Sequence, residues 1–293
     1  MSKILLSISS MNIINFIYWN AEPDFNLFGM SIRYYPFLFV IGLLISKFLI
    51  NRLLIGEGFN REKLPVMLPY MFAGVILGAR LGHCLFYEPD YFLANPLEII
   101  FPFKHDENGE LSFTGFSGLA SHGGLIGFLT AMYIYARRNK ENFIQIIDVM
   151  AVVGSFFTAF VRIGNLFNSE ILGSPTAVPW AFIFVKIDDI PRHPTQLYEA
   201  ISYVLVSVIM YIVYRKNRKD FQNGFLTGLV IVLHFICRII IEFFKEKQVD
   251  FEDNMILNMG QLLSFPFIFG GFALMYYGYK KTKKDNMTET EKN

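Results

Sequence analysis

The sequence has few charged residues, few cysteines and almost no net charge. Charged residues make up 17% of its 293 positions, whereas soluble domains carry about 25%, which argues against an ordinary soluble enzyme. A formal net charge of +1 provides no field that would attract nucleic acid. Cys84 and Cys237 are the only cysteines, and both lie in apolar runs, which excludes a disulfide framework.

Several chemical signatures are missing as well. The chain contains no serine nucleophile elbow, no glycine-rich phosphate loop and no paired-aspartate motif. Its histidines, among them His83, His122, His193 and His234, lie on different predicted elements without the spacing of a zinc site. We therefore expect no metal and no other cofactor.

Apolar residues are abundant instead. They make up 53% of the sequence, including 32 phenylalanines, and the mean hydropathy is +0.39, which excludes disorder. A helix needs about 20 apolar residues to cross a bilayer. The sequence predicts an all-α integral membrane protein with seven transmembrane helices, near Tyr35–Leu53, Leu68–Phe86, Gly118–Ala136, Phe143–Val161, Leu197–Tyr214, Gly224–Phe243 and Leu257–Tyr279.

Lysine and arginine are concentrated in alternate loops. The rich segments hold Arg52, Arg61 and Lys63; Arg137, Arg138 and Lys140; Arg215, Lys216, Arg218 and Lys219; and Lys280, Lys281, Lys283 and Lys284. Such loops face the cytoplasm, which predicts an outside N-terminus and a cytoplasmic C-terminus. We expect an interfacial N-terminal segment over residues 1–34, a transmembrane domain over 35–279 and a charged cytoplasmic tail over 280–293.

With this orientation, the polar residues of the spans fall at one depth. Exposing such a group to lipid costs about 2.5–3.5 kcal/mol, so we expect these groups to face one another around a cavity in the outer half of the bundle. They include Tyr35, Arg80, His83, His122, Arg162, Asn165, Glu170, His234, Arg238, Glu242 and Gln261.

Two arginines in this set have acidic neighbours. Arg162 and Asn165 share a helix face, Glu170 follows just past the helix, and a guanidinium suits a phosphate because it donates two parallel hydrogen bonds. A plain ion pair between Arg162 and Glu170 is the alternative. Arg238 and Glu242, four residues apart, either belong to a site or form a self-compensating pair.

Two further residues lie beside glycines. Gly74, Gly78 and Gly82 recur at a spacing that lets a second helix approach closely, so Arg80 is expected to be buried against a partner. His122 opens the third predicted span. It either exchanges a proton near neutral pH or only forms a hydrogen bond at the interface.

Six polar motifs in order resemble those of the bacterial prolipoprotein diacylglyceryl transferases. They are Gly78-Ala-Arg-Leu-Gly-His-Cys-Leu-Phe-Tyr87, Ser121-His-Gly-Gly-Leu-Ile-Gly127, Arg162-Ile-Gly-Asn165 with Asn168-Ser-Glu170, Arg192-His-Pro-Thr-Gln-Leu-Tyr-Glu199, Arg238-Ile-Ile-Ile-Glu-Phe-Phe244 and Met259-Gly-Gln261. The resemblance extends from about Tyr35 to Tyr279 and agrees with the seven-span topology.

The resemblance implies a multi-pass enzyme of the bacterial inner membrane. It would move the diacylglyceryl group of phosphatidylglycerol to the lipobox cysteine of a preprolipoprotein signal peptide, giving a thioether and glycerol 1-phosphate. By the same resemblance, His122, Arg162 and Arg238 are the candidate catalytic residues. Arg162 would bind the lipid phosphate, and the other candidate substrate-binding residues are Tyr35, Arg80, Asn165, Glu170 and Glu242.

Three positions depart from the family pattern. Pro36 stands where the family usually has glycine, and His234 stands where some members carry tyrosine. Lys245-Glu-Lys-Gln replaces the usual arginine-containing continuation, a difference expected to affect only outer loop contacts.

A transporter with a polar outer cavity is the main alternative function, although no repeated half supports it. An intramembrane hydrolase would need a nucleophile–base pair that the sequence does not show.

Overall fold

The computed structural model describes residues 16–100, 103–105, 111–113, 120–217, 223–246 and 257–290. Residues 1–15 of the expected interfacial segment, together with Arg218, Lys219 and Lys247 of the predicted loops, lie outside these residues. In order, the elements are β1 (Ile17–Trp19), β2 (Asp24–Leu27), β3 (Met30–Arg33), α1 (Tyr34–Gly56), α2 (Leu64–Phe86), α3 (Pro89–Ala94), α4 (Leu97–Ile100), β4 (Phe103–His105), β5 (Leu111–Phe113), α5 (Ser121–Asn139), α6 (Phe143–Phe167), β6 (Phe182–Phe184), β7 (Pro191–Arg192), α7 (Thr195–Asn217), α8 (Phe225–Glu242), α9 (Met259–Leu262) and α10 (Ser264–Thr290).

The chain forms two compact units, one of residues 1–49 and 150–293 and the other of residues 50–149. In the second unit, α2 and α5 lie against each other along their glycines. A Cβ atom added to Gly123 would lie 2.3 Å from the carbonyl oxygen of Gly78, so only glycine permits this approach. The prediction that the glycines of α2 serve helix packing is confirmed.

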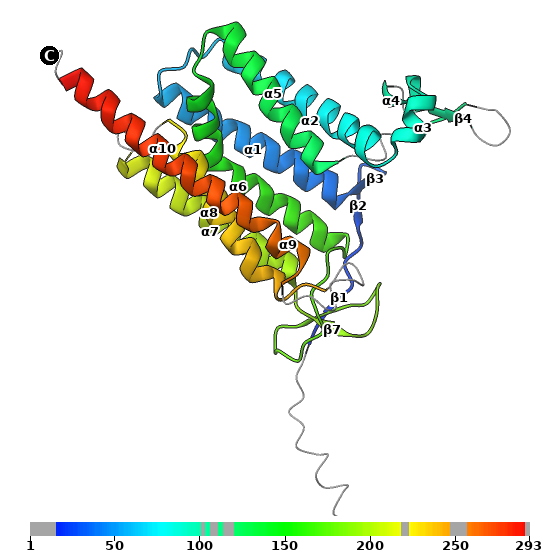
Figure 1. Ribbon diagram of the computed structural model, residues 1–293. Coiled ribbons are helices and arrows are strands. Elements are labelled where there is room, and N and C mark those ends of the chain that lie inside the picture. Colours follow the sequence, from blue (N-terminus) through cyan, green and yellow to red (C-terminus); the bar gives the residue numbers. More distant parts are fainter. Residues whose placement is uncertain are drawn as a thin grey trace, which may run out of the picture. The chain divides into compact units, whose positions relative to one another are not determined.

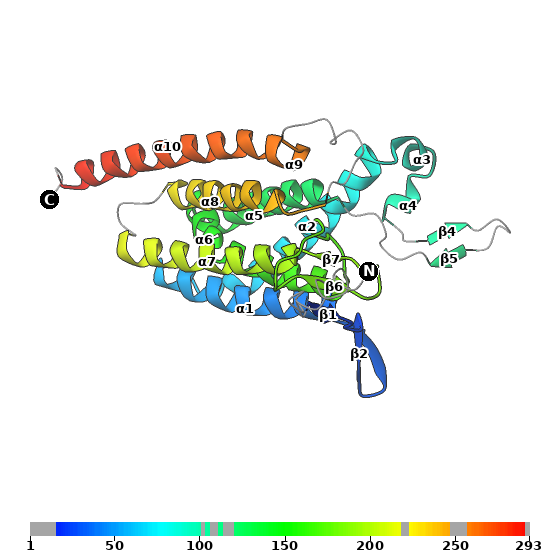
Figure 2. The ribbon, with the colours of Figure 1, turned by 90° about the horizontal axis from the view of Figure 1, so that it is seen from below.

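In the first unit, α8 lies between α7 and α10 (Figure 2). Gly228 of α8 and Gly271 of α10 allow close approach, because a Cβ atom on Gly228 would lie 2.5 Å from the carbonyl oxygen of Gly271. A three-stranded sheet in the order β1-β6-β7 covers one end of this unit (Figure 1). Trp19 of β1 is fastened there, because its indole N–H donates to the carbonyl oxygen of Leu166 at 3.1 Å.

Six helices of the described residues are long and apolar enough to cross a membrane: α1, α2, α6, α7, α8 and the segment that contains α10. They match six of the seven predicted spans, and the protein is a helical, multi-pass membrane protein. The remaining predicted span corresponds to α5. This helix does not reach the same hydropathy, because its first turn contains His122 and two glycines and its last turn contains Arg137 and Arg138.

Candidate functional site

The end of α6 brings three predicted site residues together. Arg162 donates from Nη1 to the Asn165 side-chain oxygen at 3.3 Å. Asn165 donates in turn from Nδ2 to Glu170 Oε1 at 2.8 Å, and Asn168 donates to the same oxygen at 3.1 Å. Glu170 therefore reaches Arg162 through Asn165, and the alternative of a plain Arg162–Glu170 ion pair is not what the structure shows.

The loop that carries Glu170 is held by the first turn of α7. Ser169 and Ile171, on either side of Glu170, both have positive φ angles, 51° and 59°, so the chain turns sharply as it leaves α6. Gln196 donates to the carbonyl oxygen of Glu170 at 2.7 Å, and Thr195 donates to that of Ile171 at 3.0 Å. Both side chains are fully buried, and they hold the backbone that carries the Glu170 carboxylate.

Glu199 of α7 is the direct ionic partner of Arg162. Arg162 Nε lies 3.0 Å from Glu199 Oε2, although neither atom is aligned for a hydrogen bond. Lys245 approaches the other oxygen, with its Nζ 2.9 Å from Glu199 Oε1 and 3.2 Å from Glu242 Oε2. The Glu199 side chain is only 1% exposed, so this carboxylate is shielded from water and compensated by two cations.

Arg238 and Glu242 of α8 have different surroundings. The self-compensating pair that their spacing suggested is not formed within the described part of the chain, because Glu242 pairs with Lys245 instead. Arg238 Nε is a buried donor without a hydrogen-bond partner among the described residues. Gly260, just before Gln261, allows Glu242 to approach, since a Cβ atom there would lie 2.6 Å from Glu242 Oε1.

Aromatic side chains surround these charges. Tyr203 of α7 and His234 of α8 stack with ring centroids 4.1 Å apart and an interplanar angle of 12°. Both rings lie near the charges of Arg162, Glu199 and Arg238. Tyr35 lies against the α6 backbone, because a Cβ atom on Gly164 would lie 2.8 Å from its ring. His234, at the position where some relatives are expected to carry tyrosine, thus belongs to this cluster.

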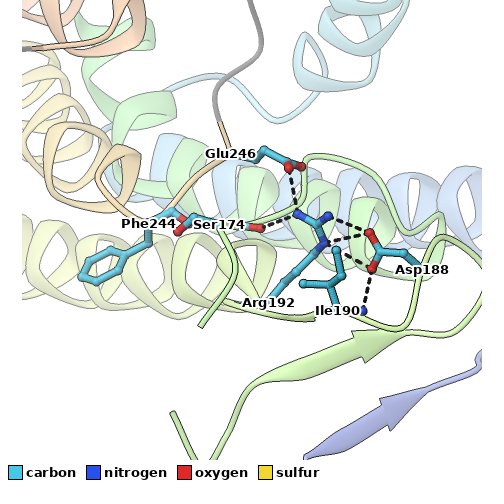
Figure 3. A network of polar contacts seen from close by, with 7 residues as sticks. Ser174, Asp188, Ile190, Arg192, Phe244 and Glu246 are labelled. Carbon is cyan, nitrogen blue, oxygen red and sulfur yellow. Dashed lines mark hydrogen bonds and ion pairs between the residues drawn. The ribbon is translucent and has the colours of Figure 1, made fainter. Parts of the chain in front are cut away.

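Arg192 forms a second ionic cluster with Asp188 and with Glu246, the residue after Lys245 (Figure 3). Arg192 Nη2 lies 2.6 Å from Asp188 Oδ2, and Nη1 lies 2.9 Å from Glu246 Oε1. Hydrogen bonds from Arg192 hold the pKa of Asp188 below its usual value, and the same bonds raise the pKa of Arg192. The backbone N–H of Glu246 also donates to the carbonyl oxygen of Leu172 at 3.2 Å. The residue after Lys245 is thereby tied to the loop that follows Glu170.

The remaining predicted residues lie in the other unit. Arg80 is buried and donates to the carbonyl oxygens of Glu98 and Ile99 at 2.7 and 3.2 Å, with its guanidinium over the Phe92 ring. The expectation that Arg80 is buried against a partner is confirmed, and that partner is the α3–α4 segment. His122 is exposed in the first turn of α5.

Two of the site's residues were not predicted. Glu199 was overlooked as a site residue, although an acidic residue in an otherwise apolar span is a signal of function. The expectation that the sequence change at Lys245 affects only outer loop contacts was wrong. Its side chain is 7% exposed and contacts two carboxylates, because the chain turns back onto α7 after α8 ends at Glu242. Within the described residues, no histidine, cysteine, aspartate and glutamate side chains are grouped as a metal site requires.

Comparison with known proteins identifies the family of the chain. A sequence profile described as prolipoprotein diacylglyceryl transferase matches residues 24–277. A Bacteroides fragilis protein named phosphatidylglycerol–prolipoprotein diacylglyceryl transferase is 44% identical over 275 residues, which is 93% of this chain and 99% of the relative. Proteins of the same name from Chloroherpeton thalassium and Tolumonas auensis are 38% and 39% identical, over 93% and 90% of this chain and 98% of each relative. The chain therefore belongs to the prolipoprotein diacylglyceryl transferase family.

Proposed function

We propose that the protein transfers the diacylglyceryl group of phosphatidylglycerol to the lipobox cysteine of preprolipoprotein signal peptides. The cysteine sulfur forms a bond to the glyceryl carbon, and the bond from that carbon to the phosphate oxygen breaks. Glycerol 1-phosphate leaves with the electron pair, and the thiol loses its proton. The names of the relatives support both substrates, and the charges at the ends of α6 and α8 support an anionic lipid.

One observation carries the proposal. Arg238 Nε is a buried donor without a hydrogen-bond partner among the described residues, and Arg162 Nε meets Glu199 Oε2 at 3.0 Å as an ion pair without hydrogen-bond alignment. A buried donor left unpaired costs about 1–3 kcal/mol, so such groups are retained where a ligand pairs with them. The oxygens of a phosphodiester are suitable acceptors, because charge-assisted bonds from guanidinium to phosphate are strong and directional.

The same arginines suit the chemical step. Negative charge grows on the phosphate as the carbon–oxygen bond breaks, and fixed cations in a site that excludes water stabilise such charge effectively. Asn165 and Glu199 hold Arg162 at the site before the lipid binds. Glu170, Glu242, Tyr35 and Arg80 complete the proposed set of substrate-binding and supporting residues, with Arg80 acting through the α3–α4 segment that it holds.

His122 is the proposed base. A free thiol has a pKa of about 8.5 and reacts as the thiolate, so a neutral imidazole that takes its proton accelerates attack near neutral pH. The exposed position of His122 in the first turn of α5 supports access of a peptide thiol to the ring.

The proposed setting is the bacterial inner membrane, with α5 as the seventh span. The α5 helix runs antiparallel to α2 with glycine contacts over several turns, which supports a course through the same bilayer. The loop charges support an outside N-terminus and a cytoplasmic tail over residues 280–293. The substrate-binding end of the transmembrane domain, residues 35–279, then faces the outer leaflet. There a lipid enters from the side and a signal peptide presents its cysteine.

The test uses purified protein in micelles that contain phosphatidylglycerol, together with a synthetic lipobox peptide. We expect a peptide whose mass increases by one diacylglyceryl group, and release of glycerol phosphate in equal amount. A control peptide with serine in place of the cysteine should remain unmodified. A transporter would produce neither product, and their absence with folded protein would refute the proposed transfer.

A further inference from the structure

Lys245 contacts two buried carboxylates instead of solvent. Its ammonium lies 2.9 Å from Glu199 Oε1 and 3.2 Å from Glu242 Oε2. Glu199 presents its other oxygen to Arg162. The four side chains thus alternate in charge from Arg162 through Glu199 and Lys245 to Glu242, and each carboxylate has a cation.

The contact between Arg162 and Glu199 has an unusual property. The two atoms are 3.0 Å apart, yet neither Arg162 Nε nor Glu199 Oε2 makes a hydrogen bond. The pair is therefore held by charge, and no hydrogen bond to Glu199 breaks if Arg162 turns toward another anion. The cost of that exchange depends on whether Glu199 keeps a cation of its own, since an uncompensated buried charge is strongly destabilising.

We propose that Lys245 is a positioning residue that keeps Glu199 compensated while Arg162 exchanges this carboxylate for the lipid phosphate. The inference rests on the proposed function, because the phosphate is that of the diacylglyceryl donor. Lys245 itself does not contact the phosphate. A cation between two carboxylates does not need the planar, two-pronged donor geometry of a guanidinium. Lysine therefore suffices at this position, whereas the phosphate-binding residue is arginine.

The test measures KM for phosphatidylglycerol and kcat at saturating peptide for Lys245→Met and Lys245→Arg. In Lys245→Met, Glu199 competes more strongly with the phosphate for Arg162, so KM should rise by about tenfold or more, the effect of losing one buried charge contact, with a smaller change in kcat. Lys245→Arg should stay near the wild type. Lys186→Met is the matched control, because Lys186 forms an exposed ion pair with Glu22 and both parameters should be unchanged.

Adding Glu199→Gln to Lys245→Met separates the two possible roles of Lys245. If Lys245 acts through Glu199, removal of that carboxylate should bring KM back to within about threefold of the wild type, because contacting residues are strongly coupled. A double variant with the same high KM as Lys245→Met would mean that Lys245 binds the phosphate itself, and would overturn the inference. In either case, an inactive wild type would mark a failure of the proposed function instead.

A folding defect does not remove the test. Should Lys245→Met fail to fold, Glu199→Gln alone provides the result, because it removes the competitor of the phosphate and leaves Lys245 paired with Glu242. The expected KM for phosphatidylglycerol is then equal to or below that of the wild type. A clear increase in KM for this single variant would contradict the exchange at Arg162.

Discussion

Gly127 of α5 lies so close to Gly74 of α2 that a Cβ atom added to Gly127 would be 2.1 Å from the Gly74 carbonyl oxygen. This contact lies in the same interface as the Gly123–Gly78 contact and belongs to the unit that contains His122. The glycine spacing of α2, which is visible in the sequence, thus helps to fix the helix that carries His122, the proposed base.

Gly127→Ala should destabilise the protein by about 1–3 kcal/mol, because the added methyl group meets backbone that cannot move aside. Gly154→Ala is the matched control, since a Cβ atom on Gly154 meets nothing within 4 Å and alanine favours the helix. Thermal unfolding in detergent, followed by circular dichroism, compares the two variants. Equal midpoints would show that α2 and α5 are not in the close contact described.

Arg162→Lys should reduce transfer by about 10²–10³-fold, the usual loss when one donor to developing charge is removed. Lysine keeps the charge but cannot donate two parallel hydrogen bonds. Arg238→Lys should be milder if Arg238 acts mainly through its charge. Product formation at equal amounts of inserted protein is the measurement, with exposed Arg215→Lys as the control. Near wild-type transfer by Arg162→Lys would rule out a bidentate contact with phosphate.

The Asp188–Arg192 pair should make stability depend on acidity. Arg192 lowers the pKa of Asp188 in the folded protein, while the unfolded carboxyl titrates near 3.9. The stabilisation is therefore present above about pH 4 and is lost as the pH falls through the folded pKa. Asp188→Asn should lower the unfolding midpoint at pH 7 and flatten its dependence on pH below about 4.

Asp189→Asn is the control for this experiment, because Asp189 is an exposed neighbour for which no ion pair is found among the described residues. Its unfolding midpoints should follow those of the wild type at every pH. Identical acid profiles for Asp188→Asn and the wild type would contradict a stabilising role of the pair.

His122→Gln should reduce transfer by about 10²–10⁴-fold if His122 is the base. Glutamine keeps a hydrogen bond but does not accept the proton. The residual activity should rise toward the thiol pKa of about 8.5, whereas the wild-type profile should rise at lower pH because His122 takes the thiol proton. Two profiles of the same shape but different height would assign His122 a positioning role.

A topology reporter tests the proposed orientation. A periplasm-dependent reporter fused after Lys284 should be silent, because the lysines near the end of α10 favour the cytoplasmic side. The same reporter fused before α1 provides the positive control for export. Full activity after Lys284 would reverse the orientation and place the Arg162 cluster on the cytoplasmic side.

Local sequence was enough to predict the membrane class, six of the spans, the glycine contacts of α2 and the grouping of Arg162, Asn165 and Glu170. These features depend on local hydropathy and helical spacing, which do not require knowledge of the other helices. Even so, the short neighbouring strands β6 and β7 were not predicted. Both lie between α6 and α7, where no long apolar run marks the structure.

Which charges meet depends on how the helices pack. Arg162 pairs with Glu199 of a different helix, and Glu242 pairs with Lys245 beyond the end of α8 instead of with Arg238 one turn earlier. Helical spacing places Arg238 and Glu242 on one face, but the partner of a buried carboxylate is the cation that the surrounding helices bring within reach. That choice depends on how α7 and α8 pack and on where the chain turns after Glu242, so it could not be read from local sequence.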